Sequence, residues 1–196
     1  MFNAIRNALL VPTHNTHFTL FVLTKETKVF VTSRVQFSLL FSKRHIDTAF
    51  AVHPDFESHT GVMQHFVGGK GATKITSAKQ KLNTSSSTTS GLVGVDQVPP
   101  LVLWTPLFVE AQGHRIDKNE VWQDNQSTVL LEKNRKTSSG KRTRASNTRH
   151  FVIADQVGRG NCAIKCCPTD DMIGDCMTKG LQGAKFATFR KKITGM

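Results

Sequence analysis

The chain is short of acidic side chains. It carries 14 aspartate and glutamate residues against 26 lysine and arginine residues, which gives a net charge of +12 and an isoelectric point of about 9.9. No acidic residue occurs from Ser58 to Val95, so this stretch offers no carboxylate ligand for a metal ion. A basic balance of this size indicates a polyanionic partner, most often nucleic acid. A basic surface without a specific partner explains the composition equally well.

Cysteine is scarce as well, and it is confined to the last 35 residues, at Cys162, Cys166, Cys167 and Cys176. The spacing C-x3-C-C-x8-C lacks the two C-x2-C pairs of common zinc modules. The pattern favours small buried residues on a strand and a helix, kept reduced in an intracellular setting, either cytoplasm or nucleus. A zinc-stabilised tail is the alternative.

Long hydrophobic runs are also missing. The longest candidate, Phe18 to Leu23, is soon followed by Lys25 and Glu26. It falls short of the roughly 20 apolar residues that cross a membrane, so we expect no membrane partner. The first 46 residues carry six basic side chains and one acidic one, which mildly resembles a mitochondrial transit peptide. A truncated domain with an unrelated leader explains the same composition.

Three parts are expected along the chain: a poorly defined leader at 1–44, a domain at 45–180 and a basic, helical tail at 181–196. Within the domain, Val, Ile and Phe content and turn signals predict strands at 46–52, 62–67, 72–77, 120–123 and 161–167. Helical spacing predicts a helix over 92–111 that breaks or kinks at Pro99-Pro100 and at Pro106, with Gly113 as its stop signal. Shorter helices are predicted at 125–133 and 147–157, and a last one carries Asp175. In the leader, TLFVL and KVFVTSRV are β-like. This order fits a mixed sheet with helices on its faces.

Five segments, in order, resemble the RNase H domain at the end of a copia-type retrotransposon Pol polyprotein. They are DTAFAVHPDFESHTG, SAKQKLNTSSSTTSGLVGVD, VWQDNQSTVLLE, GKRTRASNTRHFVIADQVGRGN and CPTDDMIGDCMTKGLQGAKF. KVFVTSRVQ, nearer the N-terminus, faintly resembles the end of the neighbouring reverse transcriptase. The resemblance implies an α/β, RNase H-like mixed five-stranded sheet with flanking helices. It also implies Mg²⁺-dependent cleavage of RNA in RNA–DNA hybrids at a two-ion site, with no small-molecule cofactor.

The resemblance also assigns the catalytic, metal-binding carboxylates. Asp47 matches the aspartate of the first strand, Asp124 the one that ends the fourth strand, and Asp175 the one on the terminal helix. The catalytic glutamate of the family falls at Gly91, which has no side chain. Asp96 is five residues further on and faces another side of a helix. Because two divalent ions need several carboxylates, the loss at position 91 predicts an impaired or inactive ribonuclease H.

A basic run extends from the end of the predicted helix at 125–133 into the start of the one at 147–157. It contains seven lysine or arginine residues from 133 to 149 and no acidic one, namely Lys133, Arg135, Lys136, Lys141, Arg142, Arg144 and Arg149. Such a run can be a solvated loop, or it can contact phosphates in a sequence-independent, salt-sensitive way. The second reading supports the alternative function, a non-catalytic nucleic-acid-binding module. Trp104 and Trp122 are expected in the core rather than as base-stacking platforms.

Overall fold

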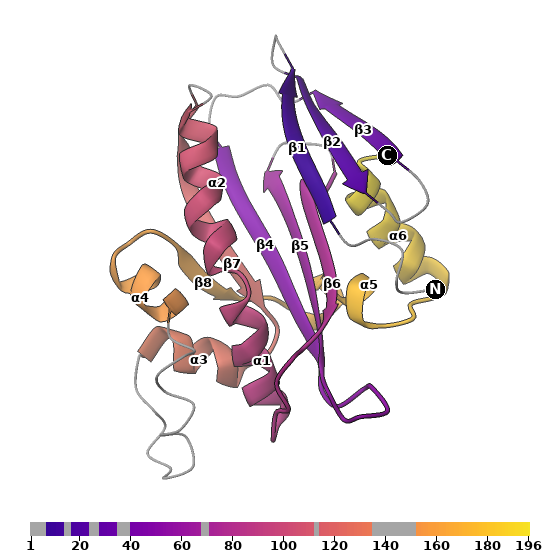
Figure 1. Cartoon of the computed structure of the whole chain (residues 1–196), viewed down its shortest axis with the longest axis vertical. Helices are drawn as coiled ribbons and strands as arrows, with labels where there is room; N and C mark the ends of the chain where they lie inside the picture. The colour runs from indigo at the N-terminus through magenta and orange to yellow at the C-terminus, as the bar shows by residue number, and fades with distance from the viewer. Residues whose placement is uncertain are drawn as a thin grey trace.

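The computed structural model describes residues 7–13, 17–23, 28–34, 40–67, 71–111, 114–134 and 152–196 (Figure 1). Side chains are described from residue 41 onward within these ranges, except at position 134. Two sequence features therefore lie outside the described residues: the predicted stop at Gly113, and the basic run from Arg135 to Arg149.

A mixed five-stranded sheet forms the centre of the domain, in the order β6-β5-β4-β7-β8. Strand β4 pairs antiparallel with β5 and parallel with β7, while β5 pairs antiparallel with β6 and β7 pairs parallel with β8. The predicted α/β fold class, with a mixed five-stranded sheet and flanking helices, is thereby confirmed. The strands are β4 (Leu40–Ala49), β5 (His59–Val67), β6 (Lys74–Lys79), β7 (Ile116–Gln123) and β8 (Ala163–Cys166).

Strand β4 begins six residues earlier than the sequence predicts, at Leu40 instead of Ile46. Its first half looks polar, yet Ser42 and Arg44 are buried. The Arg44 guanidinium donates to the Asn119 side chain and, at 3.1 Å, to the Leu101 carbonyl. Burial lowers its pKa to about 10, so it stays charged at neutral pH. The start of this central strand was missed because its arginine looks like part of a charged leader. In the fold that arginine is buried and finds hydrogen-bond acceptors.

Residues before β4 form a separate three-stranded antiparallel sheet in the order β1-β2-β3. The β-like segments of the leader correspond to β2 (His17–Leu23) and β3 (Lys28–Arg34), and β1 (Asn7–Thr13) adds a strand that the sequence analysis did not predict. In the ladders, Val11 pairs with Thr19 and Leu20 pairs with Val31.

Two helices follow β6, and the boundary between them lies at Pro99-Pro100, as the sequence predicts. Helix α1 (Ser87–Asp96) is capped by Ser86, whose side chain accepts a hydrogen bond from the backbone amide of Thr89 in the first turn. Helix α2 (Pro99–Ala111) starts at Pro99, a position where a proline costs no hydrogen bond.

The sequence predicts a break or a kink at Pro106. The helix does not break there, because α2 continues through this residue. A proline leaves the carbonyl four residues earlier without its helical donor, which here is the carbonyl of Val102. The side-chain amide of Asn119, on β7, donates to that carbonyl at 3.0 Å. A neighbouring strand therefore replaces the bond that the proline removes.

The remaining helices are short except for the last. The predicted helix at 125–133 is α3 (Gln126–Asn134), the described part of the one at 147–157 is α4 (Val152–Gly158), and the basic tail forms α6 (Gly183–Thr194). A 3-10 turn (Thr169–Asp171) and α5 (Asp175–Thr178) lie between β8 and α6.

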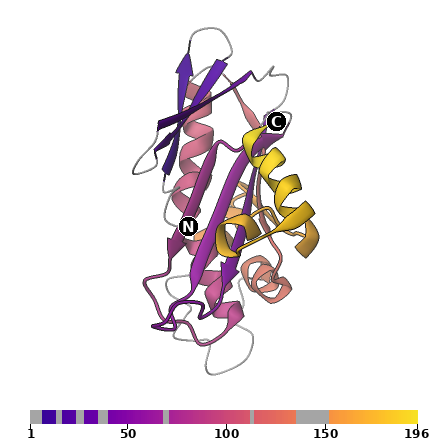
Figure 2. The same ribbon diagram turned by 90° about the vertical axis from the view of Figure 1, so that its right-hand side faces the viewer.

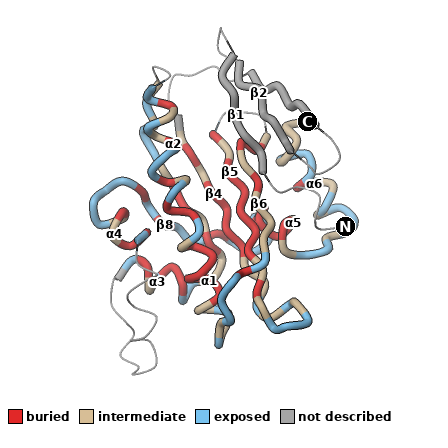
Figure 3. Tube along the Cα trace, in the orientation of Figure 1, coloured by how far each residue is buried: buried red, intermediate tan, exposed pale blue. Residues whose placement is uncertain are grey.

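The helices cover the two faces of the sheet unequally. One core cluster joins Ile46 and Val121 of the sheet to α1, α2, α3 and α4. A second joins Met63 and Ile75, from β5 and β6, to Met177 and Phe189 of the C-terminal elements. Figures 1 and 2 show α1 and α2 on one side of the sheet and α6 on the other. The buried trace runs through β4, β5 and α1 (Figure 3).

By length and composition alone, the segment from Ser87 to Ala111 could cross a membrane, with a mean hydropathy of 1.4. This segment corrects the expectation that the chain has no long hydrophobic run. Half of its most apolar window of 18 residues is buried inside the protein, and Val95, Val98 and Val102 contribute to the core against the sheet.

Close contact between α1 and β4 depends on Gly94. A Cβ atom at this position would lie 2.3 Å from Cγ2 of Thr48. We predict that Gly94→Ala destabilises the fold, because overpacking costs roughly 1–3 kcal/mol and better helix propensity returns only about 1 kcal/mol. Adding Thr48→Ser removes the clashing methyl group and should restore stability in chemical denaturation. Equal stability of the single and double variants would contradict the contact.

Glu132 of α3 is fully buried, and burial raises the pKa of its carboxyl to about 8. The Ala154 backbone lowers the pKa in part, and Asp96 raises it further. In the unfolded chain the same group titrates near 4.3. The folded state therefore holds a proton that the unfolded state has released, and stability falls as the pH rises from about 4.3 to 8. We predict that Glu132→Gln raises the melting temperature more at pH 8 than at pH 5. An equal gain at both pH values would contradict this.

Candidate metal centre

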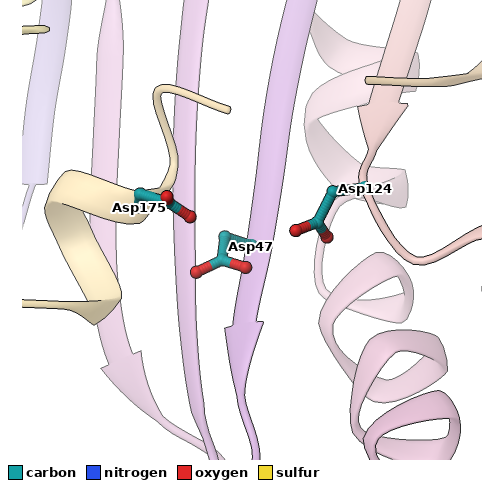
Figure 4. Close-up of side chains that lie close together, drawn as sticks. All are labelled: Asp47, Asp124 and Asp175. Atoms are coloured by element: carbon teal, nitrogen blue, oxygen red, sulfur yellow. The ribbon is translucent and has the colours of Figure 1, made fainter. Parts of the chain in front are cut away.

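Three carboxylates meet at one end of the sheet, and each comes from a different element (Figure 4). Asp47 lies near the end of β4, Asp124 follows β7, and Asp175 is the first residue of α5. Oxygen atoms of the three side chains all lie within 4.8 Å of one another. Figure 4 shows Asp47 between the other two, which point toward it. The structure thus brings together the three aspartates that the sequence analysis selected.

The pairing of β4 and β7 explains why two of them meet. These strands run parallel, and Ile46 is in register with Gln123. The next residue on each strand is an aspartate, so Asp47 and Asp124 emerge at the same edge. Asp124 is half-buried, and the Gln123 side chain accepts a hydrogen bond from its amide at 2.8 Å.

Asp175 is held in place by contacts between α5 and the sheet. The Ser77 hydroxyl, on β6, donates to the Met177 carbonyl at 2.8 Å. The Thr178 hydroxyl donates to the Asp47 carboxylate, which links α5 directly to β4. Both Asp47 and Asp175 are almost completely buried. Helix α5 is only four residues long, so these contacts fix its position rather than its own helical propensity.

Two lysines neutralise part of the cluster. Lys179 Nζ lies 2.6 Å from Asp175 Oδ1 and 3.5 Å from Asp47 Oδ2. Lys185, from α6, lies 3.2 Å from Asp175 Oδ2. Burial alone would lower the pKa of Lys179, but the hydrogen bond to Asp175 and the nearby carboxylates raise it overall. The ammonium therefore stays charged at the edge of the site.

Asp124 differs from the other two aspartates. Within the part of the chain that the structure describes, no lysine or arginine forms an ion pair with it. Burial raises the pKa of its carboxyl, and the charge of Asp47 adds to the shift. A divalent ion beside Asp124 would supply the positive charge that this side chain lacks, and oxygen-only donors suit a hard cation such as Mg²⁺ or Mn²⁺. The three residues thus fit a divalent ion.

Position 91 contributes nothing to this centre. Gly91 is buried in α1, and a Cβ atom there would lie 2.3 Å from Thr128 Oγ1, on α3. Thr128 donates to the Thr88 carbonyl at 3.3 Å, so its hydroxyl occupies the space between the two helices. Asp96 belongs to the end of the same helix and is not among the three clustered carboxylates. The site therefore lacks a fourth carboxylate from α1.

The other predicted site residues lie elsewhere. Lys133 is exposed near the end of α3, and the rest of the basic run is outside the described residues. Among the described residues, the four cysteines form no metal-binding group; Cys162 and Cys167 are buried, whereas Cys166 is exposed on β8. The expectation that Trp104 belongs to the core is wrong, since 49% of it is exposed on α2, where it stacks on Phe108.

Sequence reasoning missed the two lysines at the site. Lys179 could have been found, because it follows Asp175 by four residues and such pairs meet on a helix. Lys185 carries no comparable signal. It reaches Asp175 only because α6 packs back against the sheet through Phe189.

No protein-family model matches the chain, and no curated protein matches it. A solved structure of the prototype foamy virus protease-reverse transcriptase resembles it with a TM-score of 0.47 at 9% sequence identity. The superposition covers 82% of this chain, which spans 21% of the length of the viral protein. A likeness at this level carries no conclusion about activity, so the function is inferred from the residues of this chain.

We predict that Lys179→Met strengthens binding of Mn²⁺ on the order of 10-fold. The substitution removes an ammonium that competes for Asp47 and Asp175, and partial exposure of the lysine limits the gain. Isothermal titration calorimetry measures the change. Lys191→Met, an exposed position on α6, is the control with the same change of charge. Equal affinities for the two variants would show that Lys179 does not compete with the ion.

Proposed function

We propose that this chain is an RNase H-like domain derived from a retroelement polyprotein, with a weakened metal centre and retained nucleic-acid binding. The observation that carries the proposal is the convergence of Asp47, Asp124 and Asp175 within 4.8 Å, from the ends of two parallel strands and from the short helix α5. Oxygen ligands from separate elements of a rigid sheet are what a metal-dependent phosphodiester hydrolase requires. The net charge of +12 supports a nucleic-acid substrate.

The copia-type origin is part of the same proposal. It is supported by the five ordered segments of sequence, each of which carries an element of the domain. The segments that contain Asp47, Asp124 and Asp175 are also the ones whose carboxylates lie together. RNA in an RNA–DNA hybrid is the substrate that this origin favours.

Hydrolysis by the present chain is expected to be slow. A bound divalent ion would activate a water molecule and stabilise charge on the scissile phosphate. Asp47, Asp124 and Asp175 would hold the ion, while Lys179 and Lys185 hold the buried carboxylates in place. The missing carboxylate at position 91 leaves the site with less negative charge to attract a second ion, and Thr128 fills the space that its side chain would need.

The test is cleavage of a labelled RNA–DNA hybrid by the full chain in Mg²⁺ or Mn²⁺. We predict little cleavage by the wild type. Gly91→Glu combined with Thr128→Ala should raise the rate on the order of 10-fold or more, because a carboxylate is restored and its space is cleared. Gly91→Glu alone should gain less and should lower stability, owing to the contact with Thr128.

Asp47→Asn, in the wild-type and double-variant backgrounds, is the control for contaminating nuclease. Vigorous wild-type cleavage that Asp47→Asn abolishes would contradict the weakened centre. A folded double variant without any Asp47-dependent cleavage would contradict the nuclease origin of the site.

A further inference from the structure

One half of the sheet face that carries Asp47 has an unusual composition. Side chains alternate along a strand, so Lys43 and His45 share the face of Asp47. In the register with β7, Lys43 lies opposite Glu120 and His45 lies opposite Trp122. A row of side chains thus leads away from the aspartates: first His45 and Trp122, then Lys43 and Glu120.

Trp122 is the centre of this row. Lys43 Nζ lies 4.8 Å from the centre of its ring, and Lys165 Nζ, from β8, lies 5.6 Å from it. The indole N–H donates to Glu120 at 3.0 Å, and Lys165 pairs with the same carboxylate at 2.6 Å. An aromatic ring that is fixed by its N–H and accompanied by two ammonium groups is a surface for anionic, ring-containing ligands.

His45, beside Trp122, contributes a ring rather than a charge. The His45 ring stacks against Trp122 at 6.1 Å between centroids and against His65 at 5.5 Å. Burial lowers the pKa of His45 to about 3, and the neighbouring His65 and Lys43 act in the same direction. The positive charge of the row therefore comes from its lysines.

The C-terminal helices cover the other half of this face. Their apolar contacts are with Met63, Ala72 and Ile75, all on or beside β5 and β6. On β7 and β8, Trp122 is half-buried and the Lys165 side chain is 48% exposed. Figure 2 shows α6 along one side of the sheet. The charge of Lys192, on this helix, contributes to the lowered pKa of His45.

We propose that this surface, defined by Lys43, Trp122 and Lys165, binds a nucleic-acid strand that continues from the aspartate cluster. In this proposal the lysine ammonium groups contact backbone phosphates. A base stacks on the part of the indole ring that the lysines do not cover. The path of the nucleic acid away from the aspartates rests on the proposed function, in which these aspartates act on a phosphate. It places the interaction on the sheet itself, apart from the basic run at 133–149.

The spacing suits a continuous strand. Asp47 and Lys43 are four residues apart on β4, a distance of about 13 Å at 3.3 Å per residue. A nucleic-acid strand advances about 3.4 Å per base along its axis, so this distance corresponds to roughly four bases. A strand with one phosphate at the aspartates would pass Trp122 roughly two bases away. Charge complementarity and continuity with the metal centre both favour nucleic acid over an acidic protein.

The first experiment uses the fact that the chain has two tryptophans. Trp104→Phe keeps the stacked ring position on α2 and leaves Trp122 as the one fluorophore of its kind. We predict that an RNA–DNA hybrid, added in EDTA, quenches Trp122 fluorescence in a saturable way. Polyglutamate of equal charge should quench much less, because it offers no base to stack. Equal quenching by polyglutamate would overturn the base contact.

The second experiment measures affinity by fluorescence anisotropy of a labelled hybrid at several salt concentrations, again in EDTA. Lys43→Gln should reduce the slope of log affinity against log salt by roughly 0.7–0.9, the value for one lost phosphate contact. Arg159→Gln, which lies before β8 at the end of the sheet away from the aspartates, makes the same change of charge and should leave the slope unaltered. Equal slopes for both variants would overturn the phosphate contact.

The third variant separates stacking from stability. Trp122→Leu should weaken binding about 5-fold or more, and Trp122→Phe should recover most of the loss because it keeps a ring. Thermal melts confirm that each variant is folded; a folded Trp122→Leu protein with wild-type affinity would overturn the proposal. All three measurements exclude divalent ions, so a failure of hydrolysis leaves them intact. Conversely, cleavage without a contribution from Trp122 or Lys43 would overturn this surface and leave the metal centre standing.

Discussion

Strand β4 is the constraint on which the domain depends. It pairs along both edges, antiparallel with β5 and parallel with β7, so its side chains are confined to two faces. On one face, Ile46 anchors the core beneath α1 and α2. On the other, Lys43, His45 and Asp47 form a polar row. A shift of one residue in register would exchange the two faces and place the polar row beneath the helices, so the fold and the site are specified together.

Three carboxylates at this separation repel one another, and two of them are almost fully buried. Isolated buried charges are costly, so the cluster requires nearby positive charge. Lys179 and Lys185 supply it to Asp47 and Asp175, and the Thr178 hydroxyl adds a hydrogen bond. Asp124 has a raised pKa and the weakest compensation, which marks the side of the cluster where a divalent ion contributes most.

The sequence predicted the five strands of the domain and their order along the chain, because Val, Ile and Phe are concentrated in the strands. It predicted the break between two helices because of Pro99. It predicted the three aspartates through a resemblance, and their meeting follows from the β4–β7 register. It failed where tertiary contacts override local signals. Arg44 hides the start of β4 in the core, Asn119 of β7 compensates for Pro106 in α2, and α6 brings Lys185 to the site from ten residues away. Distant contacts of this kind leave no local pattern. The metal-binding and catalytic roles of the three aspartates, and the nucleic-acid-binding role of the basic run, stay predictions.

The central claim is that Asp47, Asp124 and Asp175 still form a divalent-ion site. Calorimetric titration of the full chain with Mn²⁺ tests it most directly, with Asp47→Asn compared with Asp117→Asn, an exposed aspartate on β7. The account predicts saturable binding by the wild type and by Asp117→Asn, and a loss of binding in Asp47→Asn. Binding that survives Asp47→Asn, or a folded wild-type protein that binds no ion, would contradict it.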